Sequence, residues 1–335
     1  MGAVVEREAG KVCLQGVKGW FVGDQGSSVH AAQASIMRAL GEDVTYAHQL
    51  GVSGLAFRLQ VHGELCPSSP HSACGWGCIE RSLAALPWTS RGLRVKADDA
   101  AGVAEARCEV VASLERGVPV QYGSEEDGVI FGYEQDGAAW HCHHPFHSKG
   151  REPYVETGWP WGLGFYGEPK AQAPDRRALA IDAMRQAVAM AEATESGGYA
   201  IGFTAWDQWP GLLRRAAELP DDQRRGRQQG NAWIYECLVN GRAGAAEYLR
   251  EVVELFGGVA ARAMEEAAGC YERLSRSILT TPERCSVTVA PYPWMEAGKD
   301  WTDGMRAEQI ERLAAGRAVE HEAVVALRRA LVGVA

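Results

Sequence analysis

The distribution of apolar and polar residues predicts one well-marked helix near the start of the chain. In residues 29–40, VHAAQASIMRAL, apolar side chains recur every three or four positions, which is the spacing of one face of a helix of about three turns. Ser27 or Ser28 can cap the start of this helix, because serine is favoured at that position. Gly41 can end it, because glycine readily adopts the backbone conformation that follows a last helical turn.

The rest of the first half predicts helices followed by strands. Helical patterns run from Cys78 to the residue before Pro87 and over residues 98–116. VPVQYG and GVIFGYEQDGAAWHCH have the composition of strands, and the second segment is expected to turn back at residues 135–137, Gln-Asp-Gly. This order indicates an α+β fold, because strand-helix-strand units do not repeat. Less regular segments are expected over 11–23 (a short strand and a turn), 44–62 (a short helix, a turn and a strand) and 66–77 (an irregular loop).

The second half has a different pattern. Residues 149–174 are dense in Pro, Gly, Trp and Tyr, and we interpret them as a long connection between two domains. Beyond them apolar residues keep helical spacing, apart from a polar stretch at 220–230 that we expect to be a mobile break. We therefore predict an α+β domain over 1–170 and a bundle of helices over 176–335. The expected helices are 175–195, 205–219, 231–256, 258–280 and 304–332.

Composition excludes several classes of partner. The formal net charge is -9 and Lys and Arg form no long basic run, so we expect neither nucleic acid nor a membrane surface as a partner. No stretch approaches the roughly 20 apolar residues that span a bilayer, and the first residues do not resemble a signal peptide. Nine cysteines without a repeated spacing favour free thiols in a reducing compartment, and we expect a cytoplasmic protein.

The segment from Val118 to His147 concentrates groups that can do chemistry. Glu125, Glu126 and Asp127 follow its first strand, and four histidines lie at its far end. A carboxylate beside a histidine can fix the imidazole tautomer and raise its basicity, whereas the simplest alternative for the acids is a solvated turn. The histidines are His141, His143, His144 and His147.

Four passages of the chain resemble a bacterial family with a papain-like fold. They are GSSVHAAQASIMRALGEDVTYAHQLGVSGLAFRLQVH, LCPSSP, GVPVQYGSEEDGVIFGYEQDG, and GYAIGFTAWDQW with GRAGAAEYLREVVELF. The family is related to bacteriocin-processing peptidases of the C39 type and to the N-terminal domain of the butirosin acyltransferase. The resemblance implies a papain-like lobe, of the cysteine-peptidase type, followed by the helical bundle.

The family motif carries over to this chain with three substitutions. In that pattern a cysteine opens the first helix, a histidine precedes a strand containing Gly-Tyr, and an Asp-Pro pair ends the next strand. Here Ser28 (or Ser27) takes the first place, Asp127 the second and His144-Pro145 the third. A cysteine-peptidase mechanism therefore does not transfer, but Ser28, His144 and Asp127 could form a rearranged catalytic set.

A shorter resemblance concerns Cys78. GWGCIERSL at 75–83 is similar to the motif around the nucleophile of autophagy-type and ubiquitin-like-modifier-processing cysteine proteases, although HCHHPFH lacks the aspartate of their Asp-Pro-His segment. At the start of a helix the dipole can lower the pKa of the Cys78 thiol and make it a second candidate nucleophile. The alternative is a buried and inert cysteine.

The remaining candidates concern a metal and a substrate. His141 and His143 fall on one face of their strand and could bind a first-row metal if His30 or Glu126 supplied a third ligand. Partial exposure and ordinary hydrogen bonding would also explain them. For a substrate cleft between the two domains we select His30, Glu126, Trp159 and Trp161, although the tryptophans could instead pack the domains together.

These observations favour one function and leave two others open. The leading interpretation is an acyl or amide transferase or hydrolase that acts on a small or peptide-like substrate. The alternative is a non-catalytic small-molecule-binding or biosynthetic accessory protein that has lost the family nucleophile. The third is a metal-dependent enzyme that uses the histidines; no other cofactor is expected. An exposed aromatic face on the helical half would favour a homodimer.

Overall fold

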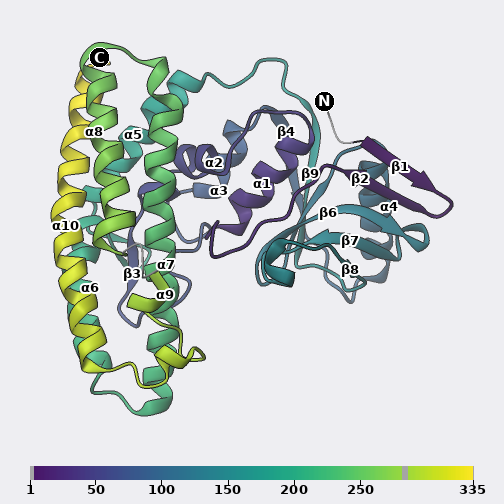
Figure 1. Ribbon diagram of the computed structural model, residues 1–335. Helices are drawn as coiled ribbons and strands as arrows, with labels where there is room; N and C mark the ends of the chain where they lie inside the picture. The colour runs from purple at the N-terminus through teal and green to yellow at the C-terminus, as the bar shows by residue number, and fades with distance from the viewer. Residues whose placement is uncertain (1–3, 281–285, 335) are drawn as a thin grey trace. The chain divides into compact units, whose positions relative to one another are not determined.

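The computed structural model describes residues 4–280 and 286–334, and their contacts divide the chain into two compact units (Figure 1). The sheet unit combines the chain up to Gln49 with residues 83–174, and the helical unit combines residues 50–82 with the chain from Asp175 onward. The predicted domains, 1–170 and 176–335, differ from this division over residues 50–82, which group with the C-terminal helices. The α+β class is confirmed.

An eight-stranded antiparallel sheet forms the sheet unit. Six strands follow the order β1-β2-β6-β5-β9-β4, while β7 pairs with β6 and carries β8. Every position of β6 from Gly128 to Tyr133 is buried, because the strand lies inside the sheet and has covered faces on both sides. The strands are β1 Val4–Glu8, β2 Lys11–Gln15, β4 Trp88–Leu93, β5 Val120–Gly123, β6 Asp127–Glu134, β7 Ala139–His143, β8 Tyr154–Glu156 and β9 Gly162–Pro169.

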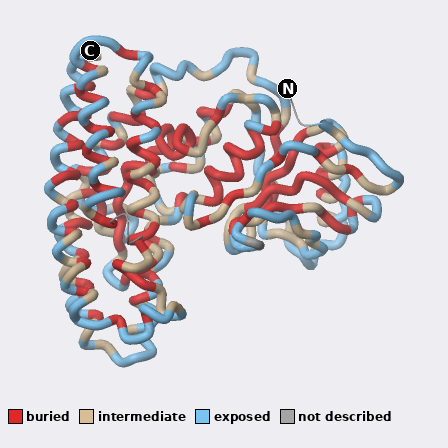
Figure 2. Tube along the Cα trace, in the orientation of Figure 1, coloured by how far each residue is buried: buried red, intermediate tan, exposed pale blue. Residues whose placement is uncertain are grey.

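Two helices cover the sheet. The helix α1 (Ser28–Ala39) contacts β5 and β6, and α4 (Ala100–Glu115) contacts β2, β5 and β6. Every residue of α1 except Arg38 is buried, so this helix is enclosed rather than amphipathic (Figure 2). The predicted end of α1 is confirmed, since Gly41 has a φ of 90°. The predicted hairpin between β6 and β7 is also confirmed, with a short 3-10 turn at Gln135–Gly137.

The expectation that residues 149–174 form only a connection is wrong. They contain β8 and the long strand β9, which is held between β5 and β4. Gly164 pairs with Gln121 on one side and with Gly92 on the other. These partners lie far from β9 in sequence, so no local pattern of turns or alternation announces the pairing.

The helical unit consists of long helices and one small sheet. The helix α10 contacts α5, α6 and α8, and α7 also packs on α8. The strands β3 (Gln60–His62), β10 (Glu195–Ser196) and β11 (Tyr199–Ile201) form the sheet. Within the described ranges, no helix combines the length and the apolar character needed to cross a bilayer. The helices are α5 Arg176–Glu192, α6 Gly202–Ala216, α7 Asp221–Val252, α8 Gly258–Arg273, α9 Ser286–Val289 and α10 Asp303–Val332; α2 (Tyr46–Ser53) and α3 (Cys78–Ala85) contain residues of both units.

The predicted break at 220–230 is also wrong, because α7 begins at Asp221 and runs through it. The buried side of this end of the helix is not apolar. Gln228 is buried and donates hydrogen bonds to the carbonyls of Pro291 and Gly298. Gly230 lies against the Leu65 carbonyl, where a side chain would not fit. A polar residue and a glycine on the packed face hide the helical pattern.

This contact gives a prediction for the helical unit. A Cβ atom at Gly230 would lie 1.7 Å from the Leu65 carbonyl oxygen. Gly230→Ala must therefore push the segment that contains Leu65 away from α7. We expect a loss of roughly 2–4 kcal/mol in the free energy of unfolding, measured by urea denaturation. Gly226 is the matched control, because it lies in the same helix and nothing is within 4 Å of its Cβ position. Gly226→Ala should stabilise the protein by up to about 1 kcal/mol, and equal effects of the two substitutions would contradict the packing.

Candidate active site

Ser28 is the first residue of α1, and its side chain meets the turn between β5 and β6. Its Oγ donates a hydrogen bond to Oε2 of Glu126 at 2.5 Å and accepts one from the backbone N–H of Asp127 at 3.0 Å. The start of α1 and the turn between the middle strands β5 and β6 therefore meet. Ser27 takes the N-cap position, and its side chain makes no capping bond. The hydroxyl of Ser28 thus forms hydrogen bonds with the turn and does not cap its own helix.

Glu126 is the carboxylate that Ser28 contacts. It is half-buried, and this burial, with Asp127 and Glu125 beside it, raises its pKa to about 7, against the opposing effect of the Ser28 hydrogen bond. A glutamate with such a pKa is present in both its protonated and its ionised form near neutral pH. It can therefore accept a proton from Ser28 and later return it.

The side chain of Asp127 points into a chain of buried polar groups. Its Oδ1 accepts a hydrogen bond from Nε2 of Gln121 at 2.8 Å, and Oε1 of Gln121 accepts one from the Tyr166 hydroxyl at 2.7 Å. Burial raises the pKa of Asp127 to about 6, and the Gln121 hydrogen bond opposes that rise. The Asp127 carboxylate thus holds the turn through Gln121, while its backbone N–H contacts Ser28.

His144 follows β7 and holds the same turn from another direction. Its Nε2 lies 3.2 Å from Oγ of Ser124, which donates to the Glu126 carbonyl at 2.8 Å. Nδ1 accepts a hydrogen bond from the backbone N–H of Phe146, so the neutral ring carries its proton on Nε2. Burial lowers the pKa of His144, although the Glu126 carbonyl raises it. Ser28, Asp127 and His144 therefore surround one turn, but among the described contacts no hydrogen bond joins His144 to Ser28 or to the Asp127 carboxylate.

His30 and the two tryptophans differ in their relation to this turn. His30 is buried in the first turn of α1, with Nδ1 2.7 Å from Oγ of Ser27. Trp161 is 71% exposed, and its backbone N–H donates to the Gly123 carbonyl at 2.8 Å, so it lies beside the turn. Trp159 instead packs on Trp140 and donates from its indole to the Val95 carbonyl, which is a packing role within the sheet unit.

His141 and His143 lie on β7 and both contact Phe131. The His143 ring stacks on it with centroids 4.7 Å apart, and the His141 ring lies at 6.3 Å. Burial lowers the pKa of both histidines. Across residues 4–280 and 286–334, no three His, Cys, Asp or Glu side chains gather in a way that could hold a metal ion. A metal site remains a prediction from the sequence.

Cys78 belongs to the helical unit and opens α3. Its side chain is fully buried, and Nη1 of the buried Arg58 lies 3.8 Å from its Sγ. Burial raises the pKa of the Cys78 thiol, with Arg58 opposing the rise, so the thiol form prevails at neutral pH. The Gly75-Trp76-Gly77 segment before it has φ angles of 84°, 63° and 59°, which leave the cysteine under a tight loop. This arrangement matches a covered thiol better than an exposed nucleophile.

The sequence did not single out every part of the site. Glu126 was selected for the cleft or as a metal ligand, but not as the partner of Ser28. Ser124 and Gln121 were not selected at all. One signal was present for Gln121, because a glutamine inside the hydrophobic run VPVQYG needs a buried hydrogen-bond partner.

Comparison with models of known protein families gives no match for this chain, and neither does a search of curated proteins. The resemblance to the bacteriocin-processing peptidases therefore rests on the quoted passages alone.

The raised pKa of Glu126 predicts how stability depends on pH. A carboxyl whose pKa is higher in the folded state contributes its full stability below the unfolded value, near 4.5, and loses it as the pH rises through about 7. Between about pH 5 and pH 8, the free energy of unfolding of Glu126→Gln should fall by about 2–3 kcal/mol less than that of the wild type. Urea unfolding at the two pH values measures this difference. Glu125→Gln is the control, since Glu125 is exposed; if all three proteins lost stability equally, Glu126 would not be the responsible group.

Proposed function

We propose that this protein catalyses acyl or amide transfer or hydrolysis on a small or peptide-like substrate, with Ser28 as nucleophile and Glu126 as general base. The observation that carries the proposal is the 2.5 Å hydrogen bond from Ser28 Oγ to a carboxyl group whose pKa is about 7. A nucleophile within hydrogen-bond reach of a base with a matched pKa is the arrangement that such chemistry requires. The residues named in the sequence change roles, because Glu126 replaces His144 as the base.

The proposed reaction has two steps. Ionised Glu126 takes the proton of the Ser28 hydroxyl as Oγ attacks the substrate carbonyl carbon, and the carbonyl π electrons move to oxygen. When the tetrahedral intermediate collapses, the bond to the leaving amine or alcohol breaks, and protonated Glu126 gives it the proton. Water or an acceptor amine then attacks the Ser28 ester with Glu126 again as base, and Ser28 recovers its proton.

The neighbouring backbone suits the charge that forms in these steps. Negative charge develops on the carbonyl oxygen, and amide N–H groups at a helix start stabilise it. Ser28 opens α1, and the Asp127 N–H already points at its Oγ. Gln121 and His144 act as positioning residues, because each holds the turn that carries Glu126 and Asp127.

The fold supports the same proposal. We propose a papain-like lobe for the sheet unit, because an antiparallel sheet there packs against a helix that begins at the candidate nucleophile. The sequence resemblance points to the same lobe and to a serine in place of the family cysteine.

One observation favours the alternative, a non-catalytic binding or accessory protein. Ser28 is only 4% exposed, and its hydroxyl already uses a donor and an acceptor bond within the protein. A serine that only fixes the turn would have the same contacts. A ligand that raises the melting temperature without being turned over would support this alternative.

Covalent labelling separates the two functions. We expect a fluorophosphonate probe to modify the folded protein at Ser28, as located by mass spectrometry of its peptides. Ser28→Ala should remove the label, and Ser27→Ala should keep it, because Ser27 contacts His30 and not Glu126. A folded wild-type protein that stays unlabelled at Ser28 would overturn the proposal.

A further inference from the structure

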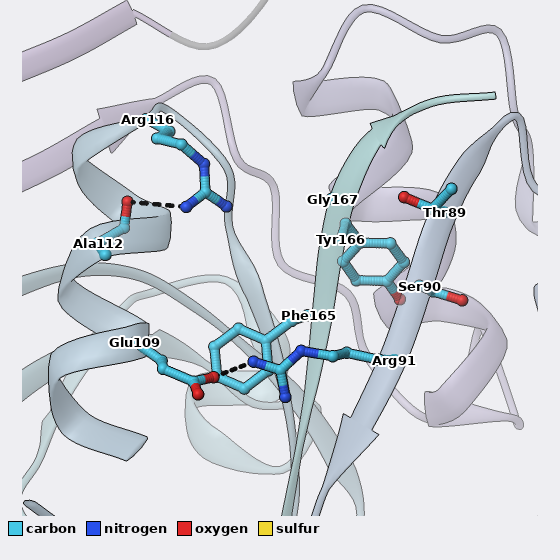
Figure 3. Close-up of a pocket in the computed structure, with 9 residues that line it drawn as sticks. All are labelled: Thr89, Ser90, Arg91, Glu109, Ala112, Arg116, Phe165, Tyr166 and Gly167. Atoms are coloured by element: carbon cyan, nitrogen blue, oxygen red, sulfur yellow. Dashed lines mark hydrogen bonds and ion pairs between the residues drawn. The ribbon is translucent and has the colours of Figure 1, made fainter. Parts of the chain in front are cut away.

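A cavity of about 350 Å³ lies on the side of the sheet that faces α4 (Figure 3). Its walls come from α4, β9 and β4, all within the sheet unit. Two of the wall positions carry little or no side chain. Ala112 stands in the middle of the helical wall, and Gly167 has no side chain on the β9 wall.

The helical wall is a single stripe of α4. Glu109, Ala112 and Arg116 are spaced three and four residues apart, which places them on one face of the helix. On the facing sheet, Arg91 of β4 pairs with Phe165 of β9, so their side chains share one face. Figure 3 shows both sets of side chains converging on the same space.

The charges along this stripe are unequal. The Arg91 guanidinium lies 4.7 Å from the centre of the Phe165 ring and forms an ion pair with Glu109, so that end of the cavity is neutral. Within the described parts of the chain, Arg116 at the other end has no ion-pair partner, and its guanidinium makes only a long hydrogen bond of 3.4 Å to the Ala112 carbonyl. The cavity therefore offers one uncompensated cation above an aromatic and aliphatic wall.

We propose that this cavity binds a small organic anion, in which a carboxylate or phosphate group pairs with Arg116 and an apolar body lies along Ala112 and Phe165. A guanidinium presents parallel N–H donors that match both kinds of anion. The cavity volume lies at the lower end of the range found for small-molecule sites. The ligand class is thus a small anion with one acidic group and a body of about the size of one aromatic ring.

This site is separate from Ser28. Phe165 and Tyr166 are consecutive on β9, so their side chains point to opposite faces of the sheet. Phe165 faces α4, and Tyr166, which also lines the cavity, uses its hydroxyl to donate to Gln121, which bonds Asp127 beside Ser28. Ser28, Glu126 and Asp127 are not among the residues that line the cavity. Binding in the cavity can therefore be tested without reference to any reaction at Ser28.

Fluorine NMR titration of three probes tests the proposal. 4-Fluorobenzoate and 4-fluorophenyl phosphate carry the two anionic groups, and 4-fluorobenzamide is their neutral counterpart. We expect one or both anions to bind the wild-type protein at least about tenfold more tightly than the amide. A preference between the two anions shows which head group the cavity takes.

Three variants locate the binding. Arg116→Gln should weaken binding of the anion at least about tenfold. Ala112→Phe should prevent binding, because the larger side chain fills the cavity while Arg116 stays in place. Arg94→Gln is the control, because Arg94 is also exposed in this unit and is outside the cavity. Circular dichroism and thermal unfolding check that each variant is folded. The proposal is overturned if neither anion binds, if the amide binds equally well, or if folded Arg116→Gln and Ala112→Phe bind as the wild type does.

Discussion

Replacing Glu126 by glutamine should lower the rate of Ser28 labelling by a fluorophosphonate about 100- to 1000-fold at about pH 8. Glutamine has nearly the same shape and can still accept a hydrogen bond from Ser28, but it cannot take a proton. A lower labelling rate in this variant therefore reports the loss of proton transfer and not the loss of the hydrogen bond that holds the turn. The measurement is the second-order rate constant of labelling, obtained from intact-protein mass spectra over time.

Two further variants show whether the effect belongs to Glu126. Glu125→Gln removes a neighbouring but exposed carboxylate and should leave the rate unchanged. His144→Ala removes a bond to Ser124 and should cost about tenfold, because the turn loosens but the base remains. If His144→Ala cost as much as Glu126→Gln, or Glu126→Gln had no effect, the assignment of the base would be wrong.

A second large effect is expected in the helical unit, where Arg242 of α7 forms a buried ion pair with Glu320 of α10. Nε and Nη2 of Arg242 lie 2.8 Å from the two oxygens of Glu320, and Nη1 donates to the Ala56 carbonyl at 2.8 Å. Burial raises the pKa of Glu320, and Arg242 opposes that rise. Arg242→Met should lower the free energy of unfolding by about 3–5 kcal/mol, because it leaves a buried carboxylate without its partner.

The double variant Arg242→Met with Glu320→Leu separates lost charge from lost packing. Removing both charges should recover most of the stability, since an apolar pair of similar volume replaces the ion pair. Arg250→Met is the surface control and should cost less than about 1 kcal/mol, because Arg250 is exposed and its partner Glu272 keeps a second ion pair with Arg276. Urea denaturation measures all four proteins. A loss for Arg242→Met no larger than that for Arg250→Met would contradict the buried pair.

The elements that were predicted correctly are those with local signals. Helix α1 follows from the spacing of apolar residues in 29–40 and from Gly41, and the hairpin follows from the Gln-Asp-Gly turn at 135–137. Strand β9 could not be predicted, because its partners β5 and β4 precede it by about 40 and 70 residues and its own sequence is rich in glycine. The start of α7 was missed because buried Gln228 and Gly230 replace the apolar residues expected on a packed face.

The site was predicted in part for the same reason. The sequence places Ser28 at a helix start and three acids in one turn, but it does not say which acid faces the serine. That choice depends on the pairing of Gly123 with Asp127, which closes the turn and directs Glu126 toward α1. Gln121 and Tyr166 come together only through the pairing of β5 with β9. Side-chain partners across strands are set by register, which the sequence did not reveal here.

The pH dependence of Ser28 labelling tests the central proposal most directly. If Glu126 is the base, the rate constant should rise with pH, pass its midpoint near 7 and level off above it, because only ionised Glu126 accepts the Ser28 proton. Glu126→Gln should lose this midpoint while keeping the fold. A wild-type rate without a midpoint near 7, or one whose midpoint survives in Glu126→Gln, would show that Glu126 does not activate Ser28.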